Sequence, residues 1–249
     1  MLVLLPPSET KVEGGIPGSR LQLKTLSFPS QLQVRGSLLE QLGELSRDEE
    51  KSLRNLKLGP KGRAEVLRNR QVESSPVMPA IERYTGVLFD ALGYGTLDVA
   101  EKEWVVRNTA VFSALFGLVR SGDLIPAYRL SHDSRLAGGS LAAQWAACAP
   151  SLWEETSDFL LDVRSEGYRR LAPIPEGSGV FVAVVREGSR KALGHANKAT
   201  KGRLVRELAQ SRADFSSTQE FLAWSKDHGW RCEKSSQGEG IIDLVISDT

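Results

Sequence analysis

Polar side chains that could carry acid–base chemistry or hold an anion follow the first apolar segment of the chain. Leu2 to Leu5 form a short apolar run that two prolines end, and Ser8-Glu9-Thr10-Lys11 comes directly after it. In α/β sheets, ligands bind at the loop that follows the carboxyl end of a buried strand. We therefore take Glu9 and Lys11 as candidate catalytic residues.

A second acidic group lies at the end of another apolar run. Asp162 follows the apolar residues 159–161 and precedes Arg164. Together with Glu9 it could supply an acid/base pair. Tyr84 or Tyr128 could orient a substrate, and Lys198 or Lys201 could bind its phosphate. The sequence leaves open whether the protein is an enzyme; if it is, these residues and Lys11 are the candidates.

Two stretches of the chain are locally basic. Residues 51–70 hold seven Lys or Arg against one Glu, and residues 186–206 hold seven against one. Such clusters suit phosphate binding, because each cation releases a condensed counterion from nucleic acid. The alternative is a solvated helix face paired with acids from elsewhere. The candidate DNA- or phosphate-binding residues are Lys57, Lys61, Arg63, Arg129, Asn197, Lys198, Lys201 and Arg206.

The first basic stretch contains Gly59-Pro60-Lys61-Gly62 between two segments with helical patterns. This arrangement is similar to the turn of a helix-hairpin-helix motif, in which backbone N–H groups at a helix start bind a DNA phosphate. Gly-Pro also simply ends one helix and begins another. Residues 37–71 are thus a candidate helix-hairpin-helix element.

The second basic stretch predicts a helix with a cationic first turn. Asn197 is the expected N-cap, and Lys198 and Lys201 recur at i and i+3 and are expected to share one face. Two cations on the first turn oppose the helix dipole, which suggests that an anion lies there.

The sequence lacks the residue spacings that are typical of metal-binding and cofactor-binding motifs. The three histidines are scattered, and no HExxH, no GxGxxG after a strand and no GxxxxGK[ST] occurs. We expect no metal and no cofactor. Cys148 and Cys232 lie far apart and are expected to be inert thiols.

The chain has 249 residues, of which 41% are hydrophobic and 25% are charged, and its net charge is +1. These values exclude a disordered chain and a globally basic nucleic-acid coat. No signal peptide or membrane span is evident, so we expect a cytoplasmic protein. The pattern predicts a mixed α/β fold with a modest sheet surrounded by helices, in one compact domain over 1–249.

Apolar spacing places the expected elements along the chain. Strands are predicted near residues 2–5, 159–163, 180–185 and 241–246. Helices are predicted over 36–69 with a break at Gly59-Pro60, over 80–92 with an interruption or end near Gly86 and Gly93, over 97–119 with a break near Asn108-Thr109, and over 140–155 and 198–209. A capping box at residues 216–220 begins another helix. Three tryptophans and two phenylalanines fall in apolar helical patterns and are expected in the core: Trp104, Trp145, Trp153, Phe112 and Phe116.

Ordered blocks along the whole chain resemble the bacterial YaaA-type peroxide stress proteins. They are residues 1–11, Arg83-Tyr-Thr-Gly-Val-Leu-Phe89, Ser113-Ala-Leu-Phe-Gly-Leu-Val-Arg120, Pro126-Ala-Tyr-Arg-Leu130, Asp162-Val-Arg-Ser-Glu-Gly-Tyr168 and residues 195–206. The resemblance implies a family-specific α/β fold and survival of hydrogen peroxide by limiting free intracellular iron. It also implies binding of double-stranded DNA through a positively charged cleft and a helix-hairpin-helix element, here over residues 53–67.

Two functions follow as hypotheses. The first is a cytoplasmic stress protein that binds duplex DNA through phosphate contacts and so limits damage from iron. The second is an enzyme acting on a nucleotide-like or phosphorylated small molecule, in a pocket formed by residues 8–11, 162–168 and 195–202. The second rests on the placement of these polar blocks at strand ends, since such convergence is typical of a pocket.

Overall fold

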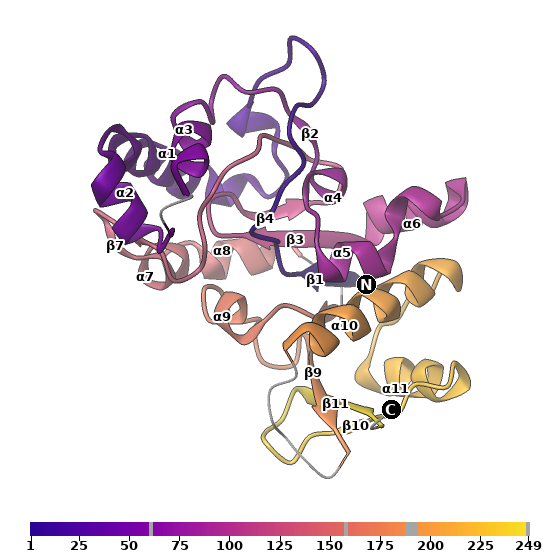
Figure 1. Cartoon of the computed structure of the whole chain (residues 1–249). Helices are drawn as coiled ribbons and strands as arrows, with labels where there is room; N and C mark the ends of the chain where they lie inside the picture. The colour runs from indigo at the N-terminus through magenta and orange to yellow at the C-terminus, as the bar shows by residue number, and fades with distance from the viewer. Residues whose placement is uncertain (60–61, 157–158, 188–193, 248–249) are drawn as a thin grey trace.

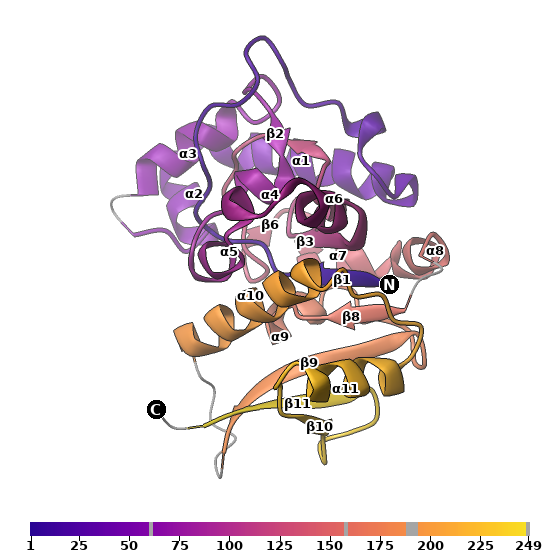
Figure 2. The ribbon, with the colours of Figure 1, turned by 90° about the vertical axis from the view of Figure 1, so that its right-hand side faces the viewer.

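A seven-stranded sheet runs through the part of the chain that the computed structural model describes, residues 1–59, 62–156, 159–187 and 194–247 (Figures 1 and 2). Its strand order is β10-β11-β9-β8-β1-β3-β4. The five strands from β11 to β3 are parallel, and the edge strands β10 and β4 are antiparallel to their neighbours. The strands are β1 (Leu2–Leu5), β3 (Thr109–Ser113), β4 (Gly117–Arg120), β8 (Leu160–Asp162), β9 (Gly179–Arg186), β10 (Cys232–Lys234) and β11 (Ile241–Ile246).

Helices and short strand pairs surround this sheet, which confirms the expected mixed α/β fold. The helices are α1 (Leu32–Arg47), α2 (Glu49–Asn55), α3 (Arg63–Arg70), α4 (Ala80–Arg83), α5 (Val87–Leu92), α6 (Val99–Asn108), α7 (Leu141–Ala146), α8 (Ala149–Glu154), α9 (Glu166–Arg169), α10 (Gly194–Gln210) and α11 (Thr218–Asp227). Two-residue strands pair β2 (Met78–Pro79) with β5 (Leu124–Ile125), and β6 (Arg135–Leu136) with β7 (Gly139–Ser140). Short 3-10 turns are Leu23–Thr25, Pro29–Gln31 and Tyr94–Thr96.

Strand β1 lies inside the sheet, between β3 and β8. All four of its residues are buried, as are all five of β3. A parallel strand covered on both faces needs a continuous apolar sequence, and Leu2 to Leu5 supply one. The residues that follow β1 therefore begin at the carboxyl edge of a buried, fully hydrogen-bonded strand.

Helix α10 packs closely against α5, and Figure 2 shows it between α5 above and β9 and β11 below. Gly202 makes this approach fit, because a Cβ there would lie 2.2 Å from the carbonyl oxygen of Leu88. Leu204, Val205 and Leu208 bury the apolar face of the helix. The basic sequence of α10 is thus anchored by a tight helix pair.

The outer edge of β4 is covered by side chains from the start of α1 and the turn before it. Gln31 accepts a hydrogen bond from the backbone N–H of Leu118 at 2.8 Å and donates to the carbonyl of the same residue at 3.0 Å. Buried Arg35 donates to the carbonyls of Phe116 at 2.7 Å and Leu118 at 2.7 Å. These side chains take the place of a further strand.

The pattern expected to be helical over 97–119 is helical only up to its expected break near Asn108-Thr109. Residues 99–108 form α6, but the part after the break is the β3–β4 hairpin and not a helix. The turn of this hairpin uses Gly117 at φ +63°. Five expected core aromatics are nevertheless buried: Trp104, Trp145, Trp153, Phe112 and Phe116. A continuous apolar run is typical of both a buried strand and a buried helix, so apolar spacing alone assigned residues 109–119 to the wrong element.

The predicted helix over 36–69 is three helices, α1 to α3, which pack on one another. The helix-hairpin-helix element stays a prediction, because Pro60 and Lys61 in its turn lie outside the described residues. The predicted helix 80–92 is divided into α4 and α5. Two smaller expectations have clear outcomes: Ser217 caps α11 as predicted, whereas α10 begins at Gly194, so Asn197 lies inside it and is not its N-cap.

Across the described ranges, no helix has the length and apolar character that crossing a bilayer requires.

Candidate functional site

The loop after β1 lies at the carboxyl edge of the sheet, where it pairs with residues 83–86. Lys11 forms an isolated antiparallel bridge with Tyr84, and the N–H of Val12 donates to the carbonyl of Arg83 at 2.9 Å. Tyr84 is free for this pairing because α4 ends before it. Gly86, at φ +100°, then allows α5 to begin; a Cβ there would lie 3.2 Å from Oγ of Ser8.

Lys11 is the central group of this meeting point. Only 8% of the residue is exposed. Its ammonium Nζ donates to the carbonyls of Ser8 at 2.9 Å and Glu9 at 3.3 Å, and it lies 4.2 Å from the ring centroid of Tyr128 and 5.3 Å from that of Tyr84. Burial lowers the pKa of this lysine to about 7, and the positive charge of Arg129 adds to the effect.

Three hydroxyl groups form a buried chain beside Lys11. Tyr84 Oη and Tyr128 Oη are 2.8 Å apart, and Tyr128 Oη and Ser113 Oγ are 2.7 Å apart. Ser113 Oγ also accepts hydrogen bonds from the N–H groups of Leu115 at 3.1 Å and Phe116 at 2.9 Å. Burial raises the pKa of both tyrosines, which keeps them protonated.

Two arginines bring positive charge to the same place. Arg129 donates to Glu9 at 2.7 Å, and Arg68 forms ion pairs with Glu13 and Glu65. The charges of both arginines reach Lys11 and lower its pKa, whereas those of Glu65 and Glu9 raise it. In both arginines the Nε atom is buried without a hydrogen-bond partner. We call Glu9, Lys11, Arg68, Tyr84, Ser113, Tyr128 and Arg129 the Lys11 cluster.

Asn69 of α3 joins this helix to the segment that contains Arg129. Its side-chain amide donates to the carbonyl of Arg129 at 2.8 Å, and its side-chain oxygen accepts from the N–H of Arg129 at 2.7 Å. These two hydrogen bonds connect the backbone of Arg129 to the residue that follows Arg68.

In two ion pairs of the Lys11 cluster, a mostly buried arginine meets an exposed carboxylate. Side-chain exposure is 63% for Glu9 and 71% for Glu13, against 15% and 16% for Arg129 and Arg68. Glu9 and Glu13 are therefore the solvent-facing partners of two mostly buried arginines, and Arg68 has a second, less exposed partner in Glu65.

Asp162 does not join the Lys11 cluster. It forms a fully buried ion pair with Arg164, whose Nε and Nη2 donate to the carboxylate at 2.9 and 2.7 Å. Buried Lys201 donates to the carbonyl of Arg164 at 2.9 Å, and burial lowers its pKa to about 8. Residues 162–168 and 195–202 thus meet through Arg164 and Lys201.

Tyr168 brings the 162–168 block towards the Lys11 cluster. It is buried and its ring meets that of His132 at 5.1 Å in a T-shaped contact. Burial raises its pKa, and nearby Tyr128 and Glu9 raise it further. Residues 162–168 and 195–202 thus contact each other, whereas the pocket expected to join both to residues 8–11 stays a prediction.

The other predicted phosphate-binding residues lie apart from the Lys11 cluster. Lys57 pairs with Asp133 at 2.5 Å and Arg63 with Glu49 at 2.8 Å, all exposed side chains. Arg206 donates to the carbonyl of Leu92 at 2.8 Å and so covers the end of α5. The side-chain oxygen of Asn197 is buried without a hydrogen-bond partner, and Lys198 is exposed. Lys61 lies outside the described residues.

Lys198 and Lys201 therefore do not present a common cationic face. Lys198 is exposed on α10 just beyond its first turn, whereas Lys201 turns inward to the carbonyl of Arg164.

Sequence reasoning missed Arg68 and Ser113. Arg68 was one of seven cations in a basic stretch, and its role depends on Glu13, 55 positions away. Ser113 was assigned to a helix, yet it ends β3 and its hydroxyl caps the hairpin turn. The one available signal was the Ser-Ala-Leu-Phe-Gly block itself, in which a glycine follows a short apolar run.

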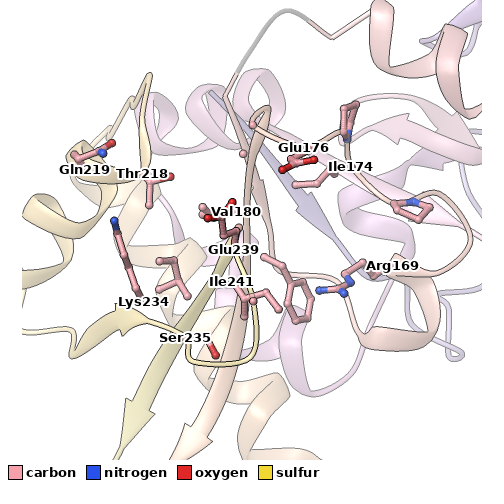
Figure 3. A pocket seen from close by; sticks show the side chains of 18 residues that line it. Arg169, Ile174, Glu176, Val180, Thr218, Gln219, Lys234, Ser235, Glu239 and Ile241 are labelled. Atoms are coloured by element: carbon pink, nitrogen blue, oxygen red, sulfur yellow. The ribbon is translucent and has the colours of Figure 1, made fainter.

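A cavity of about 710 Å³ lies at the other end of the strands, beside the amino ends of β9 and β11. Figure 3 shows Arg169 and Glu176 on one side of it and Thr218, Gln219 and Lys234 on the other. None of the predicted site residues lines this cavity. Within the described ranges, no three His, Cys, Asp or Glu side chains gather in a way that could hold a metal ion.

Comparison with known proteins identifies the family. A family model described as peroxide stress protein YaaA matches residues 1–236. The chain belongs to this family. Membership supports a general role in oxidative stress, as the sequence blocks indicated.

Relatives of similar length support the assignment. A UPF0246 protein of Streptomyces coelicolor is 40% identical over 260 residues, which cover 100% of this chain and 99% of the relative. A UPF0246 protein of Corynebacterium efficiens is 38% identical over 252 residues, covering 99% and 100%. An uncharacterized protein of Campylobacter jejuni is 25% identical over 217 residues, covering 85% and 86%.

Proposed function

We propose that this member of the YaaA family acts in the response to peroxide as an enzyme on a small anionic molecule, of a phosphorylated or nucleotide-like kind, bound at the Lys11 cluster. The observation that carries the proposal is the burial of the Lys11 amine between two tyrosine rings and beside two arginines, at the carboxyl edge of the sheet. Parallel sheets place their ligands at this edge.

Each part of the Lys11 cluster has a chemical use. A lysine whose pKa is near 7 is partly neutral at physiological pH, so it can act as a base or a nucleophile. Arg68 and Arg129 offer planar donors that match carboxylate and phosphate oxygens. Buried hydroxyls of Tyr84 and Tyr128 can donate to a substrate oxygen. Such a set of groups exceeds what stability requires, because burying a lysine costs free energy.

Isothermal titration calorimetry with inorganic phosphate and a nucleoside monophosphate tests the proposal. We expect binding by the native chain, weakened about tenfold or more in Arg129→Gln, since a charge-assisted hydrogen bond contributes about 1.5–3 kcal/mol. Arg170→Gln, at an exposed position outside the Lys11 cluster, is the matched control and should bind as the native chain does.

Two results would count against an anion site at the Lys11 cluster. One is the absence of binding by the native chain to either probe. The other is equal weakening in Arg129→Gln and Arg170→Gln, which would place the anions on diffuse surface charge.

A second candidate is binding of duplex DNA, through which the protein would limit damage from intracellular iron indirectly, by covering the DNA. The observation that favours it is the exposure of Lys198 and Arg203 on α10, the helix whose basic sequence first suggested phosphate contacts. Both candidates assume a cytoplasmic protein.

Fluorescence anisotropy of a labelled duplex at several salt concentrations tests this second candidate. If it holds, affinity falls steeply with salt, and Lys198→Ala/Arg203→Ala lowers the logarithmic salt slope by about two. Lys226→Ala, an exposed residue of α11, serves as the control. No binding at low salt would exclude duplex recognition.

A further inference from the structure

The direction of the hydrogen bonds in the Lys11 cluster follows from counting donors and acceptors. Ser113 Oγ accepts two backbone N–H groups, which uses both of its lone pairs, so its proton is donated to Tyr128 Oη. Tyr128 in turn donates its proton to Tyr84 Oη. Within the described part of the chain, the Tyr84 proton is then the one that this series of hydroxyls leaves for an outside acceptor.

The Lys11 amine lies 5.3 Å from the ring centroid of Tyr84. Two carbonyls and two tyrosine rings fix Nζ in position. A phosphate-binding lysine acts as a hydrated point charge and has no need of such burial. An amine that must be neutral to react does need it, because removal from water disfavours the ammonium form.

The two arginines define the rest of the ligand. Both guanidinium groups are mostly buried, both keep an Nε atom without a partner, and each pairs with an exposed carboxylate. A ligand held here would carry a carboxylate or phosphate, while its reactive end faces Lys11 and Tyr84.

We propose that Lys11 forms an imine with a small aldehyde or ketone that carries a carboxylate or phosphate group; this inference rests on the proposed function and specifies its substrate class. The Nζ lone pair adds to the carbonyl carbon, and the carbonyl oxygen takes the proton of Tyr84. The Tyr84 phenolate then takes a proton from Nζ, which gives the neutral carbinolamine and restores the phenol. Tyr84 donates this proton to the hydroxyl group, which leaves as water while the carbon–nitrogen double bond forms, and the last proton on the iminium nitrogen returns to the Tyr84 phenolate to give the neutral imine. One water is released and no oxidant or reductant takes part.

Reductive trapping tests the imine. The native chain is incubated with glyoxylate, an aldehyde that carries a carboxylate, and sodium borohydride, and the modified lysine is located by peptide mass spectrometry. We expect the reduced adduct at Lys11, and we expect acetaldehyde, which lacks the carboxylate, to label it at least tenfold more slowly.

Variants and a competitor separate Lys11 from other lysines. Lys11→Arg keeps the charge and should lose the adduct, whereas Lys226→Arg, an exposed position, should keep it. Tyr84→Phe should slow trapping by about a hundredfold, the usual contribution of a general acid. Because Lys11→Arg could disturb folding, inorganic phosphate is also added to the native chain, where it should protect Lys11 from trapping.

The outcomes distinguish the imine from the anion site. Labelling spread over exposed lysines, or an equal rate for acetaldehyde, overturns the imine. Calorimetric binding of phosphate without any trapping at Lys11 overturns the imine and leaves the proposed function standing. Absence of phosphate binding overturns the proposed function, even if an uncharged aldehyde reacts.

Discussion

Lys11 should make the stability of the protein depend on pH. Its pKa is about 7 in the folded chain against an ordinary value of 10.5. Between these pH values the unfolded chain holds a proton on Lys11 that the folded chain lacks, so the free energy of unfolding rises with pH across this window. Below pH 7 Lys11 is protonated in both the folded and the unfolded chain, so it no longer makes the free energy of unfolding depend on pH.

Urea titrations at several pH values inside that window measure the effect. Lys11→Met should flatten the rise relative to the native chain, and Lys226→Met, at an exposed lysine, should leave it unchanged. An equal slope in the native chain and Lys11→Met would mean that Lys11 titrates as it does in the unfolded chain.

The buried Asp162–Arg164 pair is expected to be costly to break. Both side chains are fully buried, and the carboxylate accepts two hydrogen bonds from the guanidinium. Arg164→Met leaves an uncompensated charge and should lower the free energy of unfolding by about 3–5 kcal/mol. Removing the exposed Arg231–Glu187 pair with Arg231→Met should leave the free energy of unfolding nearly unchanged, because exposed ion pairs are screened by solvent. Chemical denaturation of both variants makes the comparison, and similar losses would contradict it.

The thiol of Cys232 should react slowly, although the family is named for peroxide stress. Burial raises its pKa from 9.0 to about 11. The thiolate is the reactive form, and the higher pKa lowers the fraction of Cys232 present as thiolate at neutral pH about a hundredfold. Alkylation by iodoacetamide should accordingly be about a hundredfold slower in the folded chain than in urea. A folded-state rate equal to that in urea would show an accessible thiolate.

At the scale of elements, the α5–α10 contact depends on the lack of a side chain at Gly202. A methyl group there would meet the carbonyl oxygen of Leu88 at 2.2 Å. Gly202→Ala should therefore separate the helices and destabilise the fold by about 1–3 kcal/mol. Gly43→Ala in α1, where a Cβ has open space, should instead stabilise by up to about 1 kcal/mol. Thermal and urea denaturation give both values, and destabilisation of equal size at both sites would argue against close packing as the cause.

The elements also show what sequence could predict. Leu2 to Leu5 and the loop after them were predictable, because a prolyl stop after an apolar run marks both the strand and its polar end. Glu9 and Lys11 followed from that placement, and Tyr128, a separate candidate, lies beside Lys11. Arg68 could not be found, since its partner Glu13 lies 55 positions away in the chain. The β3–β4 hairpin was missed because burial on both faces removes the alternation that reveals a strand.

For the whole molecule, one continuous core predicts one unfolding transition. Buried residues from Met1 to Leu244 form a single cluster that includes the sheet and the helices on it. The sequence likewise predicts a single domain, and unfolding measurements test it. We expect the midpoints of urea unfolding to coincide when followed by far-ultraviolet circular dichroism and by tryptophan fluorescence. Separate midpoints would indicate two independently folding parts.

The side chains that cover β4 have a consequence for how molecules of this protein meet in solution. Gln31 and Arg35 already satisfy the outward N–H of Leu118 and the carbonyls of Phe116 and Leu118. A strand from a neighbouring molecule would have to break these hydrogen bonds before it could add there. On this side the sheet is closed to polymerisation by two residues of the same chain, and the protection lasts as long as α1 stays in place.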